Sequence, residues 1–203
     1  IGTIGVQYDN KTTLINNTTL DPIRLREILN YLANKGKNNI ILEASSHGLK
    51  QNRLDGLYFD IGIFTNLSHD HLDYHKNFSD YLNSKLHLFK NLIKKKGTII
   101  SDKSIPQYKT LKKIAVKKKL KLLSIFDKNS DLELISHKYD NNQQLLKVKI
   151  KKKNKIVNFK INLIGKIQIK NILMSMLAAE RSGLDLVSVA KLMNRLKPVE
   201  GRL

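Results

Sequence analysis

Apolar residues along the first two thirds of the chain fall into short blocks separated by longer amphipathic segments. The short blocks are continuous apolar runs, a pattern typical of strands buried in a parallel sheet. They cover residues 38–44, 59–66, 98–101 and 121–126, and residues 1–8 are strand-like as well. This succession predicts a mostly parallel sheet with helices packed on it.

The amphipathic segments between the runs predict helices. In residues 21–36 leucine and isoleucine recur at helical spacing, so one face is apolar. Asp21 is the expected N-cap of this helix, and Gly36 lies just past its end. A second helix is expected from Ser79, as N-cap, through about Lys95, and a lysine-rich helix is expected between the last two apolar runs.

The pattern changes near residue 131. Residues 131–164 alternate with a period of two and are broken twice by turn residues, which predicts an antiparallel meander. Two helices are expected after it, at about 167–182 and 185–196. The fold class we predict is therefore α/β: a doubly wound, mostly parallel sheet with helices on both faces, plus a small antiparallel β-sheet.

Composition narrows the functional classes. The chain has 203 residues, 41% of them hydrophobic, no run long enough to span a membrane and no cysteine, so disulfides and thiolate metal sites are excluded. The formal charge of +20 permits a nucleic-acid partner. The lysines cluster without arginines or aromatics, however, and this favours a solvated lysine-rich surface.

Polar residues follow two of the predicted strands directly. Residues 43–47 read EASSH, and residues 65–75 follow the next apolar run. Ligands in such folds bind beyond the carboxyl ends of the strands, so both stretches are expected in one crevice. Arg53 suits a carboxylate or a phosphate there. Ser45, Ser46 and His47 are adjacent in sequence, and adjacent residues rarely align as nucleophile and base.

Residues 69–75 read HDHLDYH and hold three of the six histidines. The spacing is close to the H-x-H-x-D-H of zinc hydrolases, but the last histidine comes one residue late, which places it on the other side of an extended backbone. A zinc site, a loop with structural histidines and a magnesium site are the alternatives. Mg²⁺ prefers oxygen ligands and needs only one or two protein groups, which Glu43 and His71 could supply.

Lys85 is notable because it continues an apolar stripe on the helix expected after residue 79. The stripe runs through Tyr81, Lys85, Leu88 and Leu92 at helical spacing. One interpretation is that the ammonium reaches water along an apolar stem. The other is that burial favours the neutral amine, which reacts with CO₂ to form a metal-binding carbamate. The pattern leaves both interpretations open.

Several of these segments together resemble the Mur ligase family, whose members build the peptide of the peptidoglycan precursor. The match is densest in EASSHGLKQNR (43–53) and FTNLSHDHLDYH (64–75). It extends to NTTLDP (17–22), YLNSKLHLF (81–89) and GRL (201–203). The members that add the third amino acid are the most similar, and the resemblance implies their central, ATP-binding domain.

The resemblance also implies roles for individual residues. The expected catalytic and metal-binding residues are Glu43, His71 and Lys85, the last as a carbamate, with Mg²⁺ as the metal. The expected contacts to UDP-N-acetylmuramoyl-L-alanyl-D-glutamate are Asn17, Thr18, Thr19, Ser45, Gln51 and Arg53. The expected contacts to ATP are Asn66, Asn171 and Arg202. Two positions depart from the family pattern: Leu20 replaces a proline, and Gln168 replaces the first asparagine of G-x-F-N-x-x-N.

The implied reaction is ATP-dependent amide formation through an acyl phosphate, with meso-diaminopimelate or L-lysine as the attacking diamino acid. Residues 1–203 are then the central domain, with the phosphate loop expected upstream of Ile1 and a C-terminal domain after Leu203, so this piece alone is expected to be inactive. A cytoplasmic monomer without a membrane span or nucleic-acid partner is expected. The alternatives are a folylpolyglutamate synthetase-like ligase, a zinc metallohydrolase and a basic nucleic-acid-binding module.

Overall fold

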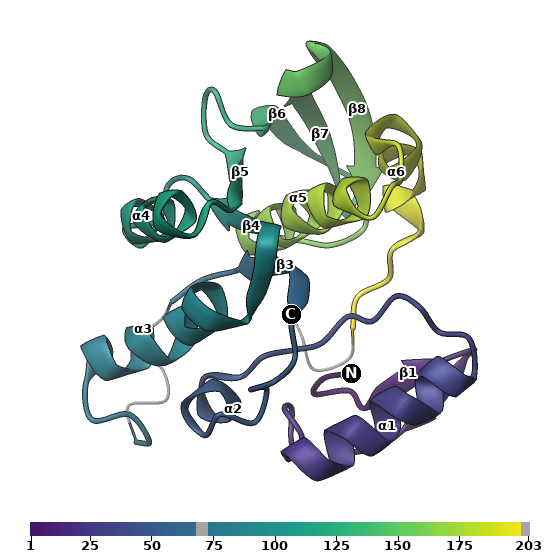
Figure 1. Ribbon diagram of the computed structural model, residues 1–203. Coiled ribbons are helices and arrows are strands. Elements are labelled where there is room, and N and C mark those ends of the chain that lie inside the picture. Colours follow the sequence, from purple (N-terminus) through teal and green to yellow (C-terminus); the bar gives the residue numbers. More distant parts are fainter. Residues whose placement is uncertain (68–72, 200–203) are drawn as a thin grey trace. The chain divides into compact units, whose positions relative to one another are not determined.

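The structure is a computed structural model that describes residues 1–67 and 73–199. The chain forms two compact units, both visible in Figure 1. Unit 1 consists of residues 1–58 and 67–92, and unit 2 consists of residues 59–66 and 93–203. Among the described residues, no helix is both long and apolar enough to cross a membrane.

Unit 1 combines a small hairpin with helices. Its elements are β1 (Val6–Tyr8), β2 (Lys11–Thr13), α1 (Pro22–Asn34), α2 (Ser46–Lys50) and α3 (Phe78–His87), which continues as a π-helical turn, η1 (Leu88–Leu92). Only the end of the strand-like segment 1–8 is therefore a strand. Asp21 is the N-cap of α1, as predicted, and its side chain accepts from the backbone N–H groups of Ile23 and Arg24. The N-cap of α3 is Asn77, not Ser79, because the Asn77 side chain accepts from the Asp80 N–H.

The expected strand at residues 38–44 does not form. Its backbone pairs with Ile1: the Ile1 backbone nitrogen donates to the Ile41 carbonyl at 2.9 Å, and the Glu43 N–H donates to the Ile1 carbonyl at 2.9 Å. Two bonds to a single residue do not make a ladder, and the side chain of Ile41 is 89% exposed. The apolar run is thus extended but neither regular nor buried, and that prediction was wrong.

Unit 2 is built on one six-stranded sheet in the order β3-β4-β5-β6-β7-β8. The strands are β3 (Phe59–Phe64), β4 (Ile93–Asp102), β5 (Lys121–Phe126), β6 (Leu132–Asp140), β7 (Gln143–Ile150) and β8 (Lys155–Ile161). Strands β3 to β6 are parallel and β6 to β8 are antiparallel. The predicted fold class is confirmed, with the difference that the meander joins the parallel strands through β5 and β6 in one continuous sheet.

The helix expected through Lys95 ends earlier. β4 begins at Ile93, which pairs with Phe59 of β3, so residues 93–95 belong to the sheet. The register shifts after this pair, and Gly97 lies close against the neighbouring backbone. A Cβ at Gly97 would stand 2.8 Å from the Lys94 carbonyl oxygen, so only glycine fits without rearrangement.

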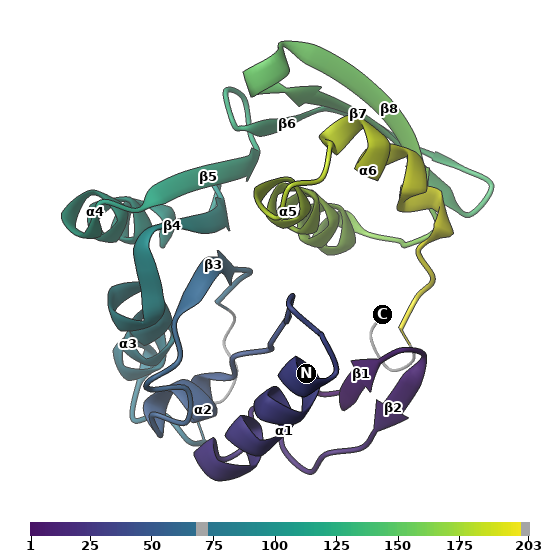
Figure 2. The same cartoon turned by 45° about the vertical axis from the view of Figure 1, so that its right-hand side comes forward.

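Helices cover both faces of the parallel strands. They are α4 (Tyr108–Lys118) and α5 (Lys166–Arg181), whereas α6 (Leu186–Leu192) packs against α5 and β8. Short 3₁₀ turns lie at Lys151–Lys153 and Met193–Arg195. The last turn replaces the end of the helix expected at 185–196. Figure 2 shows α4 and α5 on opposite sides of β4 and β5. The core of unit 2 lies between α5, α6 and the sheet and includes Ile100, Ile125, Leu132, Val148, Ile169, Leu173 and Leu177.

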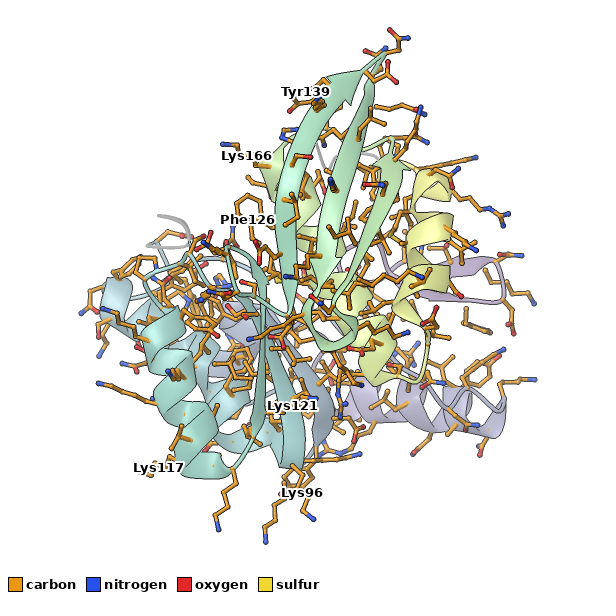
Figure 3. All side chains as sticks on the ribbon, turned by 90° about the horizontal axis from the view of Figure 1, so that it is seen from above. Lys96, Lys117, Lys121, Phe126, Tyr139 and Lys166 are labelled. Atoms are coloured by element: carbon orange, nitrogen blue, oxygen red, sulfur yellow. The ribbon has the colours of Figure 1, made fainter. Side chains whose placement is uncertain are left out.

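Lysines gather at the amino ends of the parallel strands of unit 2. We call this the basic edge, and it consists of Lys94, Lys95, Lys96, Lys117, Lys118, Lys119 and Lys121. Figure 3 shows three of these side chains extending from the same end of the unit. Within the described part of the chain, Lys94 alone among them forms an ion pair, with Asp60 at 2.9 Å. The edge is an exposed cationic surface.

Candidate functional site

Thr19 is the centre of a polar network in unit 1. Its side chain is buried, and its hydroxyl donates to the Glu43 carbonyl at 2.9 Å and accepts from the Ser45 N–H at 2.9 Å. Ser45 is the N-cap of α2, and its own hydroxyl accepts from the Gly48 N–H at 3.1 Å. A Cβ at Gly48 would stand 2.6 Å from the Thr19 side chain, so a glycine lets α2 approach this closely.

Arg53 extends the network from the far end of α2. One guanidinium nitrogen donates to the Thr19 carbonyl at 2.6 Å, and Nε donates to the side chain of Gln51 at 2.8 Å. Gln51 in turn donates to the Tyr74 hydroxyl at 2.8 Å. Arg53 is half-buried and carries five N–H donors in a fixed plane, so donors remain for a carboxylate or phosphate of a ligand.

Glu43 joins the network through its backbone carbonyl, and its carboxylate binds Thr3. Its Oε2 atom accepts from both the backbone N–H and the hydroxyl of Thr3, each at 2.8 Å. The Thr3 hydroxyl also lies 3.0 Å from that of Thr18. The six residues Thr18, Thr19, Glu43, Ser45, Gln51 and Arg53, all expected from the sequence, are therefore brought together in one network.

The arrangement at Glu43 is compatible with a magnesium ion. The carboxylate is exposed and oriented through Oε2, and a carboxylate has lone pairs for further partners. Mg²⁺ keeps several waters and needs one or two protein ligands. In residues 1–67 and 73–199, no three His, Asp or Glu side chains gather as a zinc site requires. The expected ligand His71 lies outside the described residues.

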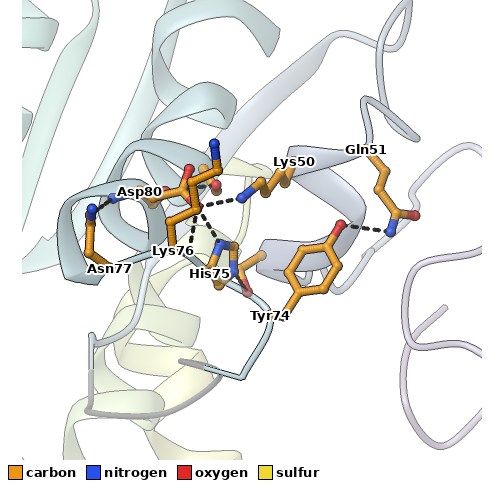
Figure 4. A network of polar contacts seen from close by, with 9 residues as sticks. Lys50, Gln51, Tyr74, His75, Lys76, Asn77 and Asp80 are labelled. Carbon is orange, nitrogen blue, oxygen red and sulfur yellow. Dashed lines mark hydrogen bonds and ion pairs between the residues drawn. The ribbon is translucent and has the colours of Figure 1, made fainter.

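His75 is a structural residue between α2 and α3. Its side chain is fully buried, its Nε2 lies 3.0 Å from the Ser46 hydroxyl, and its ring stacks on Tyr81 with 4.9 Å between centroids. Asp80 forms an ion pair with Lys50 and lies 3.6 Å from His75 Nδ1 (Figure 4). Burial, assisted by the charge of Lys50, lowers the pKa of His75, so the imidazole is neutral near pH 7.

Lys85 lies on α3, which packs against α2. It is half-buried, and its Nζ atom stands 5.3 Å from the centroid of the Tyr81 ring, the same ring that stacks on His75. An amine beside an aromatic face and only partly in water fits both interpretations of the apolar stripe. Carbamate formation on Lys85 stays a prediction.

The remaining predicted residues form no hydrogen bond of this network. Asn17 is exposed and lines a cavity of about 690 Å³ in unit 1. In unit 2, Asn66 follows β3 and is exposed, whereas Asn171 lies on α5 and is half-buried. Arg202 lies outside the described residues. The sequence did not indicate Thr3 or Tyr74 as members of the network. Their partners, Glu43 and Gln51, lie 40 and 23 positions away in the sequence, and no single motif contains both residues of either pair.

The comparison with known families decides between the alternatives. Residues 1–179 match the model of the Mur ligase middle domain. The chain belongs to this family. The match favours the ligase over the zinc metallohydrolase and the nucleic-acid-binding module. The chain spans 41–43% of the length of the first curated relatives, so it corresponds to part of such a protein.

Individual relatives share one enzyme name. The chain is 33% identical to the UDP-N-acetylmuramoyl-L-alanyl-D-glutamate–2,6-diaminopimelate ligase of Chelativorans sp. (strain BNC1), with 100% of this chain and 42% of the relative covered. It is 34% identical to the ligase of the same name from Zymomonas mobilis subsp. mobilis, with 100% and 41% covered. A solved structure of such a ligase superposes with a TM-score of 0.88 at 27% identity, covering 100% of this chain and 41% of that one.

Proposed function

We propose that this chain is the middle domain of a ligase that adds diaminopimelate to UDP-N-acetylmuramoyl-L-alanyl-D-glutamate at the expense of ATP. The observation that supports this most directly is the network around Thr19. It joins Thr18 and Thr19 to Ser45, Gln51 and Arg53, residues of two separate segments that the resemblance assigned to one substrate site. The relatives that match the whole chain carry the name of this ligase.

The residues of the network have distinct tasks in this proposal. Arg53, held by Thr19 and Gln51, binds a carboxylate of the precursor and keeps it in place for attack on the γ-phosphate of ATP. Ser45 and Thr18 orient the peptide part by hydrogen bonds. Asn66 and Asn171 contact the nucleotide from unit 2. Most of the rate enhancement then comes from positioning and charge neutralisation, as is general for phosphoryl transfer.

The proposed metal ligands are Glu43, His71 and the carbamate of Lys85. Bound Mg²⁺ would supply neutralisation of phosphate charge, and Glu43 is oriented for this by its two bonds from Thr3. We further propose a cytoplasmic location, a monomeric state and diaminopimelate, in preference to lysine, as the added residue. The last point rests on the names of the relatives.

The test uses the full-length protein. Phosphate release from ATP is measured with the precursor, adding diaminopimelate or L-lysine in turn. Phosphate release that requires both the precursor and diaminopimelate supports the proposal. Release that requires the precursor and L-lysine, but does not occur with diaminopimelate, would show that lysine is the amino acid added. If neither amino acid stimulates release, the proposed ligase activity is rejected.

A matched pair of variants tests the site. Arg53→Lys keeps the charge but loses the planar fork of donors, so the KM for the precursor should rise about tenfold or more. Arg26→Lys is the control, because Arg26 also donates to a backbone carbonyl, that of Asp55 at 3.0 Å, but lies outside the network. Equal kinetic effects of the two variants would argue against Arg53 as a substrate contact.

A further inference from the structure

In residues 1–67 and 73–199, the non-glycine positions with left-handed backbone share one residue preference, with three exceptions. Most non-glycine residues with positive φ are Asn or Asp, the side chains that tolerate this conformation best. The exceptions are Lys96 (φ 63°), Lys119 (φ 55°) and Phe126 (φ 83°). Phe126 is the least expected, because a bulky aromatic residue at positive φ is an outlier.

Phe126 is the central residue of a γ-turn at the end of β5. The Asp127 N–H donates to the Ile125 carbonyl at 3.2 Å, which closes a three-residue turn around the positive φ of Phe126. γ-Turns with positive φ are rare and strained. In Figure 3 Phe126 lies away from the basic edge represented by Lys96 and Lys121, at the carboxyl end of the sheet. Strained residues at such places cluster at ligand sites.

The Phe126 ring forms one wall of an enclosure around the Lys170 ammonium. Lys170 Nζ stands 4.7 Å from the ring centroid, 2.5 Å from Asp102 Oδ2 and 3.3 Å from the Ser104 hydroxyl. The Asp102 side chain is 1% exposed, and its Oδ1 accepts from both the N–H and the hydroxyl of Ser104 at 2.8 Å. We call Phe126, Lys170, Asp102 and Ser104 the ammonium clamp.

The ammonium clamp connects the start of α5, through Lys170, to the end of β4, through Asp102. Helix α5 runs antiparallel to β4, because Arg181 at its end donates to Thr98 in the middle of β4, whereas Lys170 near its start reaches Asp102 at the end of β4. The first two turns of α5 therefore lie over the carboxyl ends of β4 and β5. Asn171, the proposed nucleotide contact, directly follows Lys170 on this part of the helix.

We propose that Phe126 and Lys170 are positioning residues for the nucleotide, which hold Asn171 at the carboxyl edge of unit 2. This rests on the proposed function, since it needs ATP in that site. The γ-turn places the aromatic face of Phe126 against the Lys170 ammonium. Glycine or asparagine at this position would leave that side of the ammonium without an aromatic contact. The buried carboxylate gives the ammonium a fixed partner, so α5 has little freedom to slide along the sheet.

The experiment measures the affinity of the full-length protein for a non-hydrolysable ATP analogue by calorimetry, together with thermal unfolding without nucleotide. Phe126→Gly keeps the positive φ accessible and removes the ring, and we expect analogue binding about tenfold weaker with little change in unfolding temperature. Lys119→Gly is the matched control, because it makes the same kind of change at the basic edge. It should leave the affinity unchanged. Lys170→Arg should retain most of the affinity, whereas Lys170→Met should lose it.

The outcomes separate this proposal from the proposed function. Unchanged affinity in Phe126→Gly and Lys170→Met overturns the clamp, whatever the ligation assay shows. An equal loss of affinity in Lys119→Gly also overturns it, because the effect would then be a general one of added glycine. If the unmodified protein binds the analogue but does not ligate, the ligase proposal fails. The affinities of the variants for the analogue then still show whether Phe126 and Lys170 position the nucleotide contact. If the unmodified protein binds no analogue, both are rejected.

Discussion

Thr19→Val should destabilise unit 1 by removing a hydroxyl while keeping the shape of the side chain. Thr19 is 2% exposed, and its hydroxyl serves the Glu43 carbonyl and the Ser45 N–H at once. A lost hydrogen bond costs about 1 kcal/mol net, and a buried polar group left without a partner costs about 1–3 kcal/mol. Glu43 is exposed and can turn to water, so we expect a total loss of about 2–3 kcal/mol in the free energy of unfolding.

Thr19→Ser is the matched control for this prediction. It keeps the hydroxyl and removes one methyl group, for which about 1 kcal/mol is expected. Urea unfolding followed by circular dichroism gives the free energies, and hydrogen exchange at the Ser45 amide reports the local bond, which matters because two units need not unfold together. Equal destabilisation in the two variants, or unchanged exchange at Ser45 in Thr19→Val, would refute the role assigned to the hydroxyl.

Three further predictions concern other residues. Gly48→Ala should lower the unfolding temperature through a loss of about 1–3 kcal/mol, because its Cβ would stand 2.6 Å from the buried Thr19 side chain; an unchanged melting curve would contradict this. His75 has a folded pKa below its ordinary value of about 6.5, so its contribution to stability is complete above that pH and declines as the pH falls below it. The decline, measured by thermal unfolding between pH 8 and 5, should be smaller in His75→Phe. Lys119→Asn should raise the free energy of unfolding by about 0.5–1 kcal/mol, because Asn tolerates a φ of 55° better than Lys; a loss in urea unfolding would count against this.

The strands of unit 2 were predictable because their apolar positions form short continuous runs or alternate with a period of two. Residues 121–126 form β5 with the bounds that the apolar run predicts, and 59–66 contains β3. The same reasoning failed at 38–44, where an equally apolar run lacks a partner ladder. Pairing partners are a tertiary property, so an apolar run forms a strand only where the rest of the fold supplies a neighbouring strand for it to pair with.

The boundary at Ile93 shows a second limit of the pattern. Apolar spacing on α3 continues through the π-helical turn at 88–92, so this pattern does not indicate that the helix ends there. Pairing with Phe59 of β3 requires an extended backbone at Ile93 and takes precedence over local helix propensity. Asn77 and Ser79 are both good N-cap residues, and only the structure distinguishes them.

The candidate site was predictable from resemblance and only partly from chemistry. Spacing alone pointed to Glu43, Arg53 and Lys85 as unusual residues. It could not indicate that Thr19 connects the first two through its backbone and side chain, because a buried threonine is common in any core. Thr3 was missed for a related reason: its two bonds to Glu43 span 40 positions of sequence.

Phe126 could not be predicted at all, and energetics explains why it is informative. A bulky residue at positive φ costs about 1–3 kcal/mol. The contact of its ring with the Lys170 ammonium stabilises the fold by about 0.5–1 kcal/mol. Half burial of the ring adds about half of the 1.5–3 kcal/mol of full burial, which is about 1 kcal/mol. These contributions nearly cancel, so stability alone gives no preference for phenylalanine over glycine or asparagine at this turn. The Asn and Asp residues at most other left-handed positions show that this chain otherwise uses the relaxed choice. Stability therefore does not account for the ring at position 126, and its contact with the lysine that precedes Asn171 supports the proposed role in positioning α5.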